Sequence, residues 1–470
     1  MSAEPAFASV DRLRALIDAR ELSVAELVAT CIERIERLDP GLNAVVALRP
    51  DAALAEAAAA DRAAPADRGP LHGMPFTVKD VTETLDLPTT WGSRAFAGHA
   101  AGFDSAPVAH LRRAGAILIG KTNTPELACE PVTRGALFGE TCNPWLPVRT
   151  PGGSSGGAAA GLAAGMFPLA QGTDAGGSIR IPASCCGVVG IKPTRGRVSF
   201  SPSGVEPWGG LLHCGPLART VRDAAAMLDA MAGPGIGDAS ALLRAPGLRA
   251  ACDRGTGELR IAVTGAVAGG ELDSDVAAAF ADALDVLREL GHDPVPAAPD
   301  ASALPPLFAV IAEATFAGLA ASLSDEQLEC IEVTSRQLID RGRLISAEGY
   351  LAAVDAARRE SVQIMSFWER FDVLITPTVP WVPPPRACLP RTEDYDAKWA
   401  QYGIWETFTS PWNVTGQPAI SVPCPRLSRE GLPIGLQLVG RFGAEAQLVS
   451  LAAAYETAAP WAHRRPAALS

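Results

Sequence analysis

The spacing of hydrophobic and polar residues changes repeatedly along the chain between a helical pattern and short, continuously apolar runs. In SVAELVATCIERIERLD, apolar residues recur at helical spacing, and Ser23 with Glu26 three residues later forms the motif of a capping box. A second helix is predicted from Ala106 to Gly115, and the run AILIG directly after it is typical of a buried strand. A helix followed by a buried strand is the first unit that the pattern predicts.

Further strands and helices alternate in the same way. A strand is predicted in PFTVKD, ending at Lys79 and Asp80, and another in FPLAQGTD, which runs into the glycine loop TDAGGS. After Gly215 the pattern predicts a helix in RTVRDAAAMLDAMAG, a strand in LRIAVTG and a helix in SDVAAAFADALDVLRELG. Short apolar strands that alternate with helices indicate an α/β protein whose central mixed β-sheet is covered by helices on both faces.

The pattern indicates one large domain rather than two. The sequence shows no internal repeat, and no segment has the composition of a true hinge between domains. We therefore expect residues 1–470 to form a single domain with a helical, substrate-shaping region at about 300–370.

Composition and charge argue against several classes of protein. Of the 470 residues, 48% are hydrophobic and 20% are charged, a balance typical of globular proteins with a large core. The formal net charge of −12 argues against nucleic acid or an anionic membrane as the main partner. The N-terminus lacks the pattern of a signal peptide, and no apolar run is long enough to span a membrane. The ten cysteines form no C-x-x-C pair, so we expect a cytoplasmic protein with reduced thiols and no metal site.

The stretch TPGGSSGGAAAG combines glycines with two serines, which raises two familiar alternatives. A phosphate-binding loop is disfavoured, because no lysine follows the glycines and serines occupy positions where G-x-G-x-x-G needs glycine. Gly152, Ser154 and Gly156 do match the G-x-S-x-G motif of an α/β-hydrolase, but the preceding NPWLPVRTP has three prolines and predicts a loop instead of a strand. The histidines that follow, none in a distinctive context, are His213, His292 and His463.

A second glycine loop, GTDAGGSIRIPA, places Ser178 directly after a predicted strand. Successive backbone N–H groups from Ala175 through Gly176 and Gly177 to Ser178 could converge in such a loop and bind a developing oxyanion. A serine nucleophile needs a base, and no histidine lies near either loop. Lys79 is the candidate base, because burial would lower its pKa and leave a neutral amine; a solvated surface lysine is the alternative.

Four segments resemble the amidase signature family: LHGMPFTVKD, the long run from TPGGSSGG to GGSIRIPA, GVVGIKPTRGRVS and GPLARTVRDA. The flanking segments TTWGS, LRRAGAILIGKTNTPE and NVTGQPAISVP fit the family as well, so the resemblance covers most of the chain, with a signature core at about 70–220. It implies the amidase signature fold, no cofactor and a Ser–cisSer–Lys triad. Lys79 matches the lysine of that triad, Ser154 the serine held by a cis peptide bond, and Ser178 the nucleophile.

The resemblance also implies supporting roles. Ser155 is expected to hydrogen-bond Lys79. Asp174 and Arg180 are expected to pair and to fix the nucleophile loop, with a surface ion pair as the alternative. By the family pattern, Ala128 lines the acyl side of the substrate pocket.

The resemblance leaves the identity of the amide open. One branch of the family, the glutamine-hydrolysing component of the tRNA-dependent amidotransferase, binds glutamine through a tyrosine, an arginine and an aspartate. Here the corresponding helical segment IAEATFAGLA has no tyrosine, Glu406 falls near the place of the aspartate, and Arg358 or Arg359 is the candidate arginine. These departures disfavour the glutamine role without removing it as an alternative.

The tryptophans of the later chain favour a different substrate. We interpret them as candidate pocket walls for apolar or aromatic substrates, with burial in the core as the alternative: Trp381, Trp399, Trp405 and Trp412. The prediction is therefore a stand-alone hydrolase of apolar or aryl small-molecule amides, for which esters, anilides or carbamates are also reachable substrates. A non-catalytic binding protein is disfavoured, because all three triad residues are present. The oligomeric state stays open, with a homodimer as one candidate.

Overall fold

A single mixed β-sheet forms the centre of the molecule. The computed structural model describes residues 4–204, 206–243, 247–390 and 394–467. Within them, eleven strands form one sheet in the order β1-β3-β2-β4-β6-β5-β10-β11-β9-β7-β8. The strands are β1 (Val45–Leu48), β2 (Pro75–Lys79), β3 (Ile117–Thr122), β4 (Leu169–Asp174), β5 (Val189–Lys192), β6 (His213–Ala218), β7 (Ile261–Val263), β8 (Val295–Pro296), β9 (Val373–Pro377), β10 (Ala419–Pro423) and β11 (Gly435–Gly440).

Both strand directions occur in this sheet. Strand β2 runs parallel to β3 and β4, and β7 runs parallel to β8 and β9. Strand β6 is antiparallel to β4 and β5, and β10 is antiparallel to β5 and β11. The predicted α/β class with a mixed sheet is confirmed.

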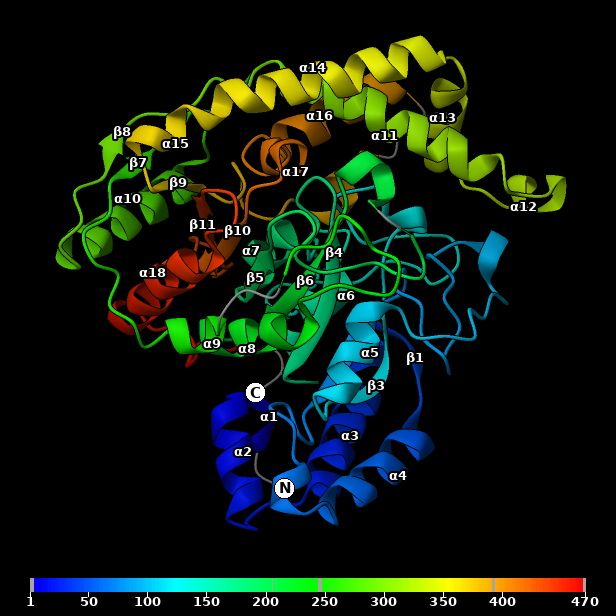
Figure 1. The fold of residues 1–470 in the computed structure, drawn as a ribbon, viewed down its shortest axis with the longest axis vertical. Helices are drawn as coiled ribbons and strands as arrows, with labels where there is room; N and C mark the ends of the chain where they lie inside the picture. Colours follow the sequence, from blue (N-terminus) through cyan, green and yellow to red (C-terminus); the bar gives the residue numbers. More distant parts are fainter. Residues whose placement is uncertain (1–3, 205, 244–246, 391–393, 468–470) are drawn as a thin grey trace.

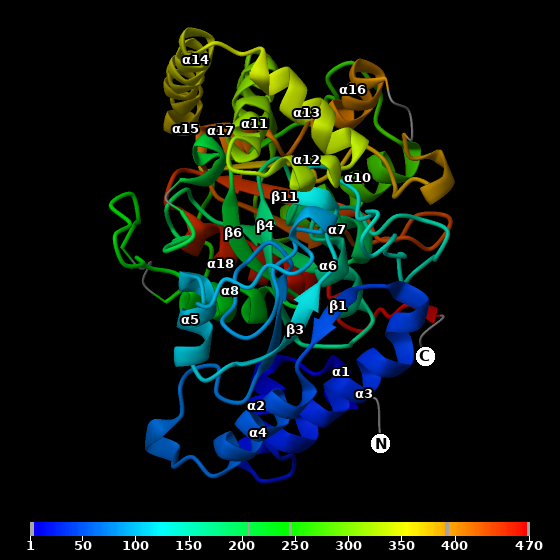
Figure 2. The same cartoon turned by 90° about the vertical axis from the view of Figure 1, so that its right-hand side faces the viewer.

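The helices that surround the sheet are α1 (Glu4–Phe7), α2 (Val10–Asp18), α3 (Val24–Leu42), α4 (Pro50–Asp61), α5 (Ala106–Arg113), α6 (Gly156–Ala163), α7 (Arg180–Cys186), α8 (Val221–Met231), α9 (Leu248–Ala251), α10 (Ser274–Glu289), α11 (Leu304–Ala320), α12 (Asp325–Glu329), α13 (Val333–Arg343), α14 (Ala347–Met365), α15 (Phe367–Arg370), α16 (Tyr395–Trp405), α17 (Pro411–Thr415) and α18 (Glu445–Ala458). Helices α6 and α7 cover one face of the central strands, and α8 and α18 cover the other (Figure 2). This arrangement buries all residues of β2, β4 and β11.

Several elements begin and end where the sequence predicts. Helix α3 starts with the expected capping box, in which Ser23 Oγ accepts from the N–H of Glu26 and the Glu26 carboxylate accepts from the N–H of Ser23. Helix α5 and strand β3 occupy the predicted helix-and-strand unit, and β4 ends at Asp174, directly before the second glycine loop. The stretch before the G-x-S-x-G match contains no strand, as its prolines indicate.

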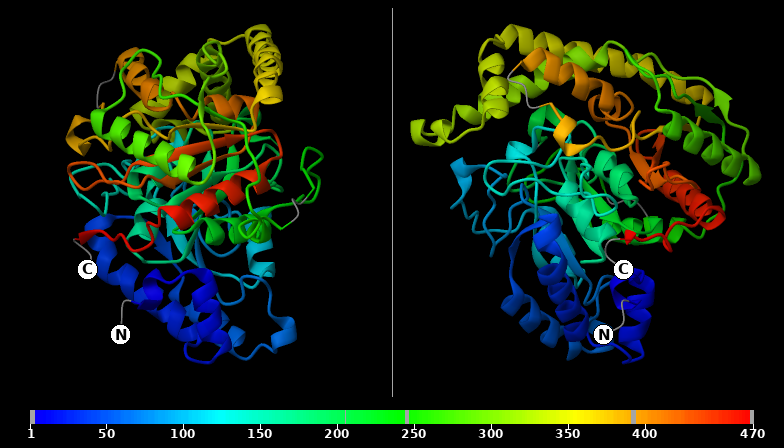
Figure 3. Two further views of the ribbon diagram at one scale, coloured as in Figure 1. Left: turned by 90° about the vertical axis from the view of Figure 1, so that its left-hand side faces the viewer. Right: turned by 180° about the vertical axis from the view of Figure 1, so that it is seen from behind.

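Two groups of helices lie at opposite ends of the molecule. Helices α1 to α4 lie at one end with the two termini nearby, and α11 to α14 lie at the other end, beyond the sheet (Figure 1; Figure 3). Residues of α11 and α13 form a small hydrophobic cluster with Leu127, far from the N-terminal helices. Among the described residues, no helix combines the length and the apolar character needed to cross a membrane.

Candidate active site

Lys79 is the last residue of β2, and its side chain is completely buried. Its Nζ donates hydrogen bonds to Ser154 Oγ at 2.6 Å and to Thr173 Oγ1 at 3.0 Å. Burial lowers the pKa of Lys79 to about 7, although the Asp174 carboxylate favours the charged form. A large fraction of Lys79 is therefore neutral near pH 7, as a proton acceptor must be.

Ser154 and Ser178 lie on two loops that the fold holds together. The peptide bond between Gly153 and Ser154 is cis, as the family resemblance implies. The N–H of Ser155 donates to the carbonyl oxygen of Ser178 at 3.1 Å and so fixes the first loop to the second. Ser178 is 9% exposed, whereas Ser154 is 1% and Lys79 is 0% exposed. Of the three side chains, Ser178 is the one most accessible to a substrate.

The loop between β4 and α7 presents unused backbone donors. Within the described chain, the N–H groups from Ala175 through Gly176 and Gly177 to Ser178 donate to no acceptor, whereas the next N–H, of Ile179, donates to the Asp174 carboxylate at 3.1 Å. Gly177 has a φ of +144°, and a Cβ there would lie 2.5 Å from Thr409 Oγ1, so glycine is required. A run of unpaired N–H groups in one turn can bind a negatively charged oxygen.

A buried ion pair supports this loop from within the protein. Asp174 and Arg180 are both 0% exposed, and Arg180 donates from Nε and Nη2 to the Asp174 carboxylate at 2.9 and 2.8 Å. Arg180 also donates to Asn413 Oδ1 at 2.6 Å and to Gln437 Oε1 at 2.8 Å. Although burial alone would raise the pKa of Asp174, Arg180 holds that pKa below its usual value. The predicted pair is confirmed, and the alternative of a surface ion pair is wrong.

The expected hydrogen bond between Ser155 and Lys79 is wrong. The Ser155 hydroxyl instead donates to the carbonyl oxygen of Thr173 at 3.2 Å and accepts from its N–H at 3.3 Å, because the side chain points onto the backbone of β4. Thr173, which sequence reasoning missed, takes the expected place, since its hydroxyl accepts from Lys79. Only the pairing of β2 with β4 could have pointed to Thr173, and the sequence does not specify that pairing.

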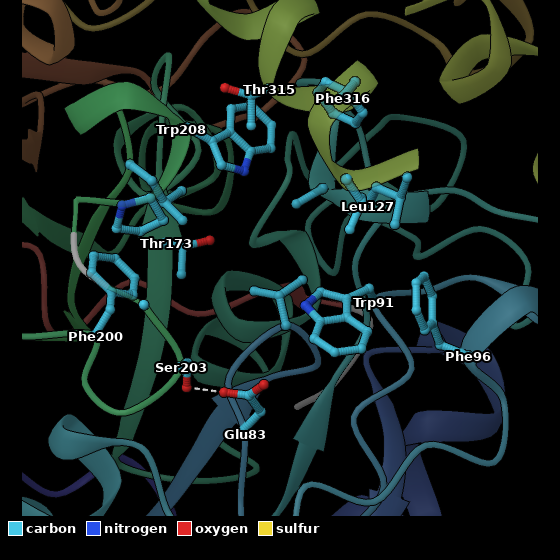
Figure 4. Close-up of a pocket in the computed structure, with 16 residues that line it drawn as sticks. Glu83, Trp91, Phe96, Leu127, Thr173, Phe200, Ser203, Trp208, Thr315 and Phe316 are labelled. Carbon is cyan, nitrogen blue, oxygen red and sulfur yellow. Dashed lines mark hydrogen bonds between the residues drawn. The ribbon is translucent and has the colours of Figure 1, made fainter. Parts of the chain in front are cut away.

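Thr173 lines a cavity of about 370 Å³ (Figure 4). The hydroxyl of Thr173 accepts the hydrogen bond from Lys79, so the buried lysine lies directly behind this part of the cavity wall. Ala128, in the 3₁₀ turn η3 (Glu126–Ala128), lines this cavity; that it contacts the acyl group of a substrate stays a prediction. The aromatic side chains among its walls are Trp91, Phe96, Phe200, Trp208 and Phe316. Thr315 and Phe316, which also line the cavity, belong to α11 within the helical region at about 300–370; its role in shaping a substrate stays a prediction. The cavity suits an apolar or aromatic group.

The tryptophans expected to line the pocket lie elsewhere, and their interpretation as pocket walls is wrong. Trp405 is 2% and Trp412 is 4% exposed, and both belong to the hydrophobic core. Trp381 and Trp399 are partly buried against that core. Sequence reasoning cannot separate a core tryptophan from one in a cavity wall, because both are apolar and mostly buried.

The residues considered for glutamine recognition do not assemble as a group. Arg358 and Arg359 lie on the exposed side of α14, with side chains 77% and 68% exposed, and both pair with Asp355. Glu406 does lie at the loop, since a Cβ on Gly176 would be 3.0 Å from its Oε2. Burial and the charge of Asp174 raise the pKa of Glu406 to about 8.

The comparisons with known proteins agree with this geometry. A family model named Amidase matches residues 26–449. The match, the mixed sheet and the buried lysine–serine pair together define the class, an α/β enzyme that hydrolyses amide bonds. Over 98% of both chains, the sequence is 40% identical to AmiB2 of Mycobacterium tuberculosis. The chain belongs to the amidase signature family.

Other relatives differ in their named activities. The sequence is 36% identical to a glutamyl-tRNA(Gln) amidotransferase component of Chloroflexus aurantiacus, over 97% of this chain and 98% of the relative. The structure is similar to that of a 6-aminohexanoate cyclic dimer hydrolase complexed with substrate, with a TM-score of 0.91, 34% identity and coverage of 99% and 100%. It is also similar to a bacterial aryl acylamidase, with a TM-score of 0.87, 29% identity and 97% coverage of each chain.

Proposed function

We propose that Ser178, Ser154 and Lys79 are the catalytic triad of an amidase that cleaves apolar or aryl amides through an acyl-enzyme. The observation that carries the proposal is the completely buried Lys79, whose Nζ donates to Ser154 Oγ at 2.6 Å and whose pKa burial lowers to about 7. A neutral lysine in contact with a serine hydroxyl can receive a proton through that hydroxyl.

The reaction follows from these roles. Ser178 Oγ attacks the amide carbon while its proton passes through the Ser154 hydroxyl to Lys79. The carbonyl oxygen, now negative, accepts hydrogen bonds from the N–H groups of residues 175–178. The C–N bond then breaks, and the same relay returns the proton to the leaving amine. Water attacks the Ser178 ester by the same path and releases the carboxylic acid.

The walls of the cavity support apolar or aryl amides as substrates. Five aromatic side chains line it, and the structure resembles that of an aryl acylamidase. Ala128 faces the acyl group in this arrangement. Esters, anilides and carbamates can enter the same acyl-enzyme route, because each has a carbonyl carbon bonded to a leaving group.

Glutamine hydrolysis for a tRNA-dependent partner is the second candidate, and the 36% identity to the amidotransferase component favours it. The exposed positions of Arg358 and Arg359 and the absence of tyrosine from α11 oppose it. The bound α-carboxylate of glutamine would need a cation that these arginines do not supply.

A turnover panel tests the proposal. It comprises glutamine, short aliphatic amides, anilides, peptide amides and carbamates, each measured with wild-type protein and with Ser178→Ala. We expect anilides or apolar amides to be hydrolysed, Ser178→Ala to be inactive, and a fluorophosphonate to label only the wild type.

Three outcomes would contradict the proposal. An active Ser178→Ala beside an inactive Ser154→Ala would favour the G-x-S-x-G alternative, and glutamine turnover that requires an added partner would favour the amidotransferase. No labelling and no turnover would favour a binding protein.

A further inference from the structure

Glu83 is the only ionisable side chain among the described residues that line the cavity. It lies on the loop after β2, is partly exposed, and faces walls that are otherwise apolar, aromatic or hydroxyl-bearing. Figure 4 shows Glu83 beside Ser203, with Thr315 and Phe316 across the cavity and Thr173 between. A carboxylate in such a place needs a reason, because apolar surroundings disfavour its charge.

The protein itself gives the Glu83 carboxylate little compensation. Ser203 Oγ donates a hydrogen bond to it, and no ion pair within the described chain includes it. Lys121 is the cation that acts on it electrostatically, but the Lys121 Nζ donates to the Thr82 carbonyl at 2.6 Å and to Thr89 Oγ1 at 2.7 Å. Lys121 also lies 3.8 Å from the Asp80 carboxylate. The Glu83 carboxylate thus remains open to a cation from the cavity.

Hydrogen bonds fix the backbone at Glu83, so its carboxylate has a defined position for binding a substrate. Its carbonyl oxygen accepts from the N–H and the hydroxyl of Ser105, both at 3.1 Å. Ser203 lies on a neighbouring loop, where Ser201 accepts from the N–H of Ala106 at 2.7 Å. Two separate loops therefore position the carboxylate and its hydroxyl partner.

From this juxtaposition we infer that Glu83 is a specificity-determining residue that selects amides carrying a protonated amine away from the scissile bond. The aromatic walls hold the apolar body of such a substrate, and the ammonium group donates to Glu83. A substrate with a carboxylate at the same end is rejected by charge repulsion. The inference rests on the proposed function and deepens it by naming a substrate class.

Matched substrates test the inference. The first series consists of the 4-nitroanilides of 4-methylphenylacetic, 4-(aminomethyl)phenylacetic and 4-carboxyphenylacetic acid, which differ in charge on the acyl side. The second consists of phenylacetyl amides of 4-methylaniline, 4-(aminomethyl)aniline and 4-aminobenzoic acid, which differ on the amine side. The kcat/KM of each compound is measured for wild-type protein, Glu83→Gln and the control Glu206→Gln, which removes an exposed acid outside the cavity.

In at least one series, we expect the cationic compound to exceed the neutral one by about ten-fold in kcat/KM, the effect of one charge-assisted hydrogen bond at a partly exposed site. The anionic compound is expected to be the poorest. Glu83→Gln should abolish the differences in kcat/KM among the cationic, neutral and anionic compounds. High salt should weaken these differences, and Glu206→Gln should retain them.

The inference would be overturned if the wild-type protein hydrolysed the cationic, neutral and anionic compounds of both series with equal kcat/KM. This outcome does not depend on whether Glu83→Gln folds. An order that persists in folded Glu83→Gln would overturn it as well. Hydrolysis of the neutral compounds would in either case leave the proposed function standing. The absence of turnover for every compound would instead overturn the proposed function, and this inference with it.

Discussion

Lys79 sets the pH dependence of the proposed reaction, because only its neutral form accepts a proton. Burial lowers its pKa from 10.5 to about 7, so the protonated, inactive form dominates in acid and the neutral form above neutrality. We expect kcat/KM for a neutral anilide to rise about ten-fold per pH unit below this pKa and to stop rising once the pH exceeds it. A profile that is flat from pH 5 to pH 9 would contradict a lysine base.

Glu406 gives the same profile a second limb. Burial raises its pKa to about 8, and its carboxyl lies beside Gly176, so ionisation above this pH places a negative charge near the developing oxyanion. We expect kcat/KM for the same anilide to fall above about pH 8 in the wild type and the fall to disappear in Glu406→Gln. If both proteins decline equally, Glu406 does not act on the oxyanion loop.

Helices α11 and α13 pack against each other, and each contains a glycine. The surroundings of these two glycines differ. A Cβ on Gly342 of α13 would lie 2.0 Å from the carbonyl oxygen of Glu313 on α11, so this glycine permits the close approach of the two helices. Gly318 of α11 is exposed, and a Cβ there would meet nothing within 4 Å. The first position needs glycine for packing, whereas the second has no such need.

These positions predict opposite changes in stability. Gly342→Ala should lower the free energy of unfolding by about 1–3 kcal/mol through overpacking. Gly318→Ala should raise it by about 0.5–1 kcal/mol, because alanine loses less backbone entropy in a helix. Chemical denaturation measures both. Gly342→Ala should also raise KM for aryl amides, since α11 carries Phe316 of the cavity wall. If the free energy of unfolding of Gly342→Ala equalled that of the wild type, the two helices could move apart at no cost and the prediction would be wrong.

At the scale of the whole molecule, the C-terminal third supports a nucleophile that lies in the first half. Asn413 of α17 donates to the Asp174 carboxylate at 2.9 Å and accepts from Arg180 at 2.6 Å. Asn413→Ala removes one hydrogen-bond partner from each of these two buried groups and should cost about 1–3 kcal/mol of stability. Because the loop before α7 also loosens, we expect kcat to fall in the protein that remains folded.

Thr415→Val is the control for Asn413→Ala. Thr415 belongs to the same helix and is buried, but among the residues that the structure describes its hydroxyl bonds only the carbonyl oxygen of Pro411, at 3.0 Å. Thr415→Val should retain the wild-type kcat, measured at saturating substrate. If Asn413→Ala retained it too, the ion pair alone would suffice to hold the loop.

The sequence predicted the parts of the molecule that local motifs encode. Lys79, Ser154 and Ser178 each lie in a short segment with its own pattern, and the strands and loops around them were predicted correctly. The aromatic walls of the cavity were not predicted, because Trp91, Trp208 and Phe316 come from separate segments that meet only in the packed protein. Glu83 was not singled out from the sequence, because its place in the cavity depends on side chains from distant segments.

The strand order has a consequence for how the protein is made. Strands β10 and β11 are synthesised last, yet they lie between β5 and β9 in the middle of the sheet. While the nascent chain leaves the ribosome, β5 and β9 therefore expose unpaired backbone until nearly the whole polypeptide has emerged. Polypeptides released before residue 419 lack both inserted strands, so we expect them to be inactive and prone to aggregate, and we expect chaperones to shield those edges during translation.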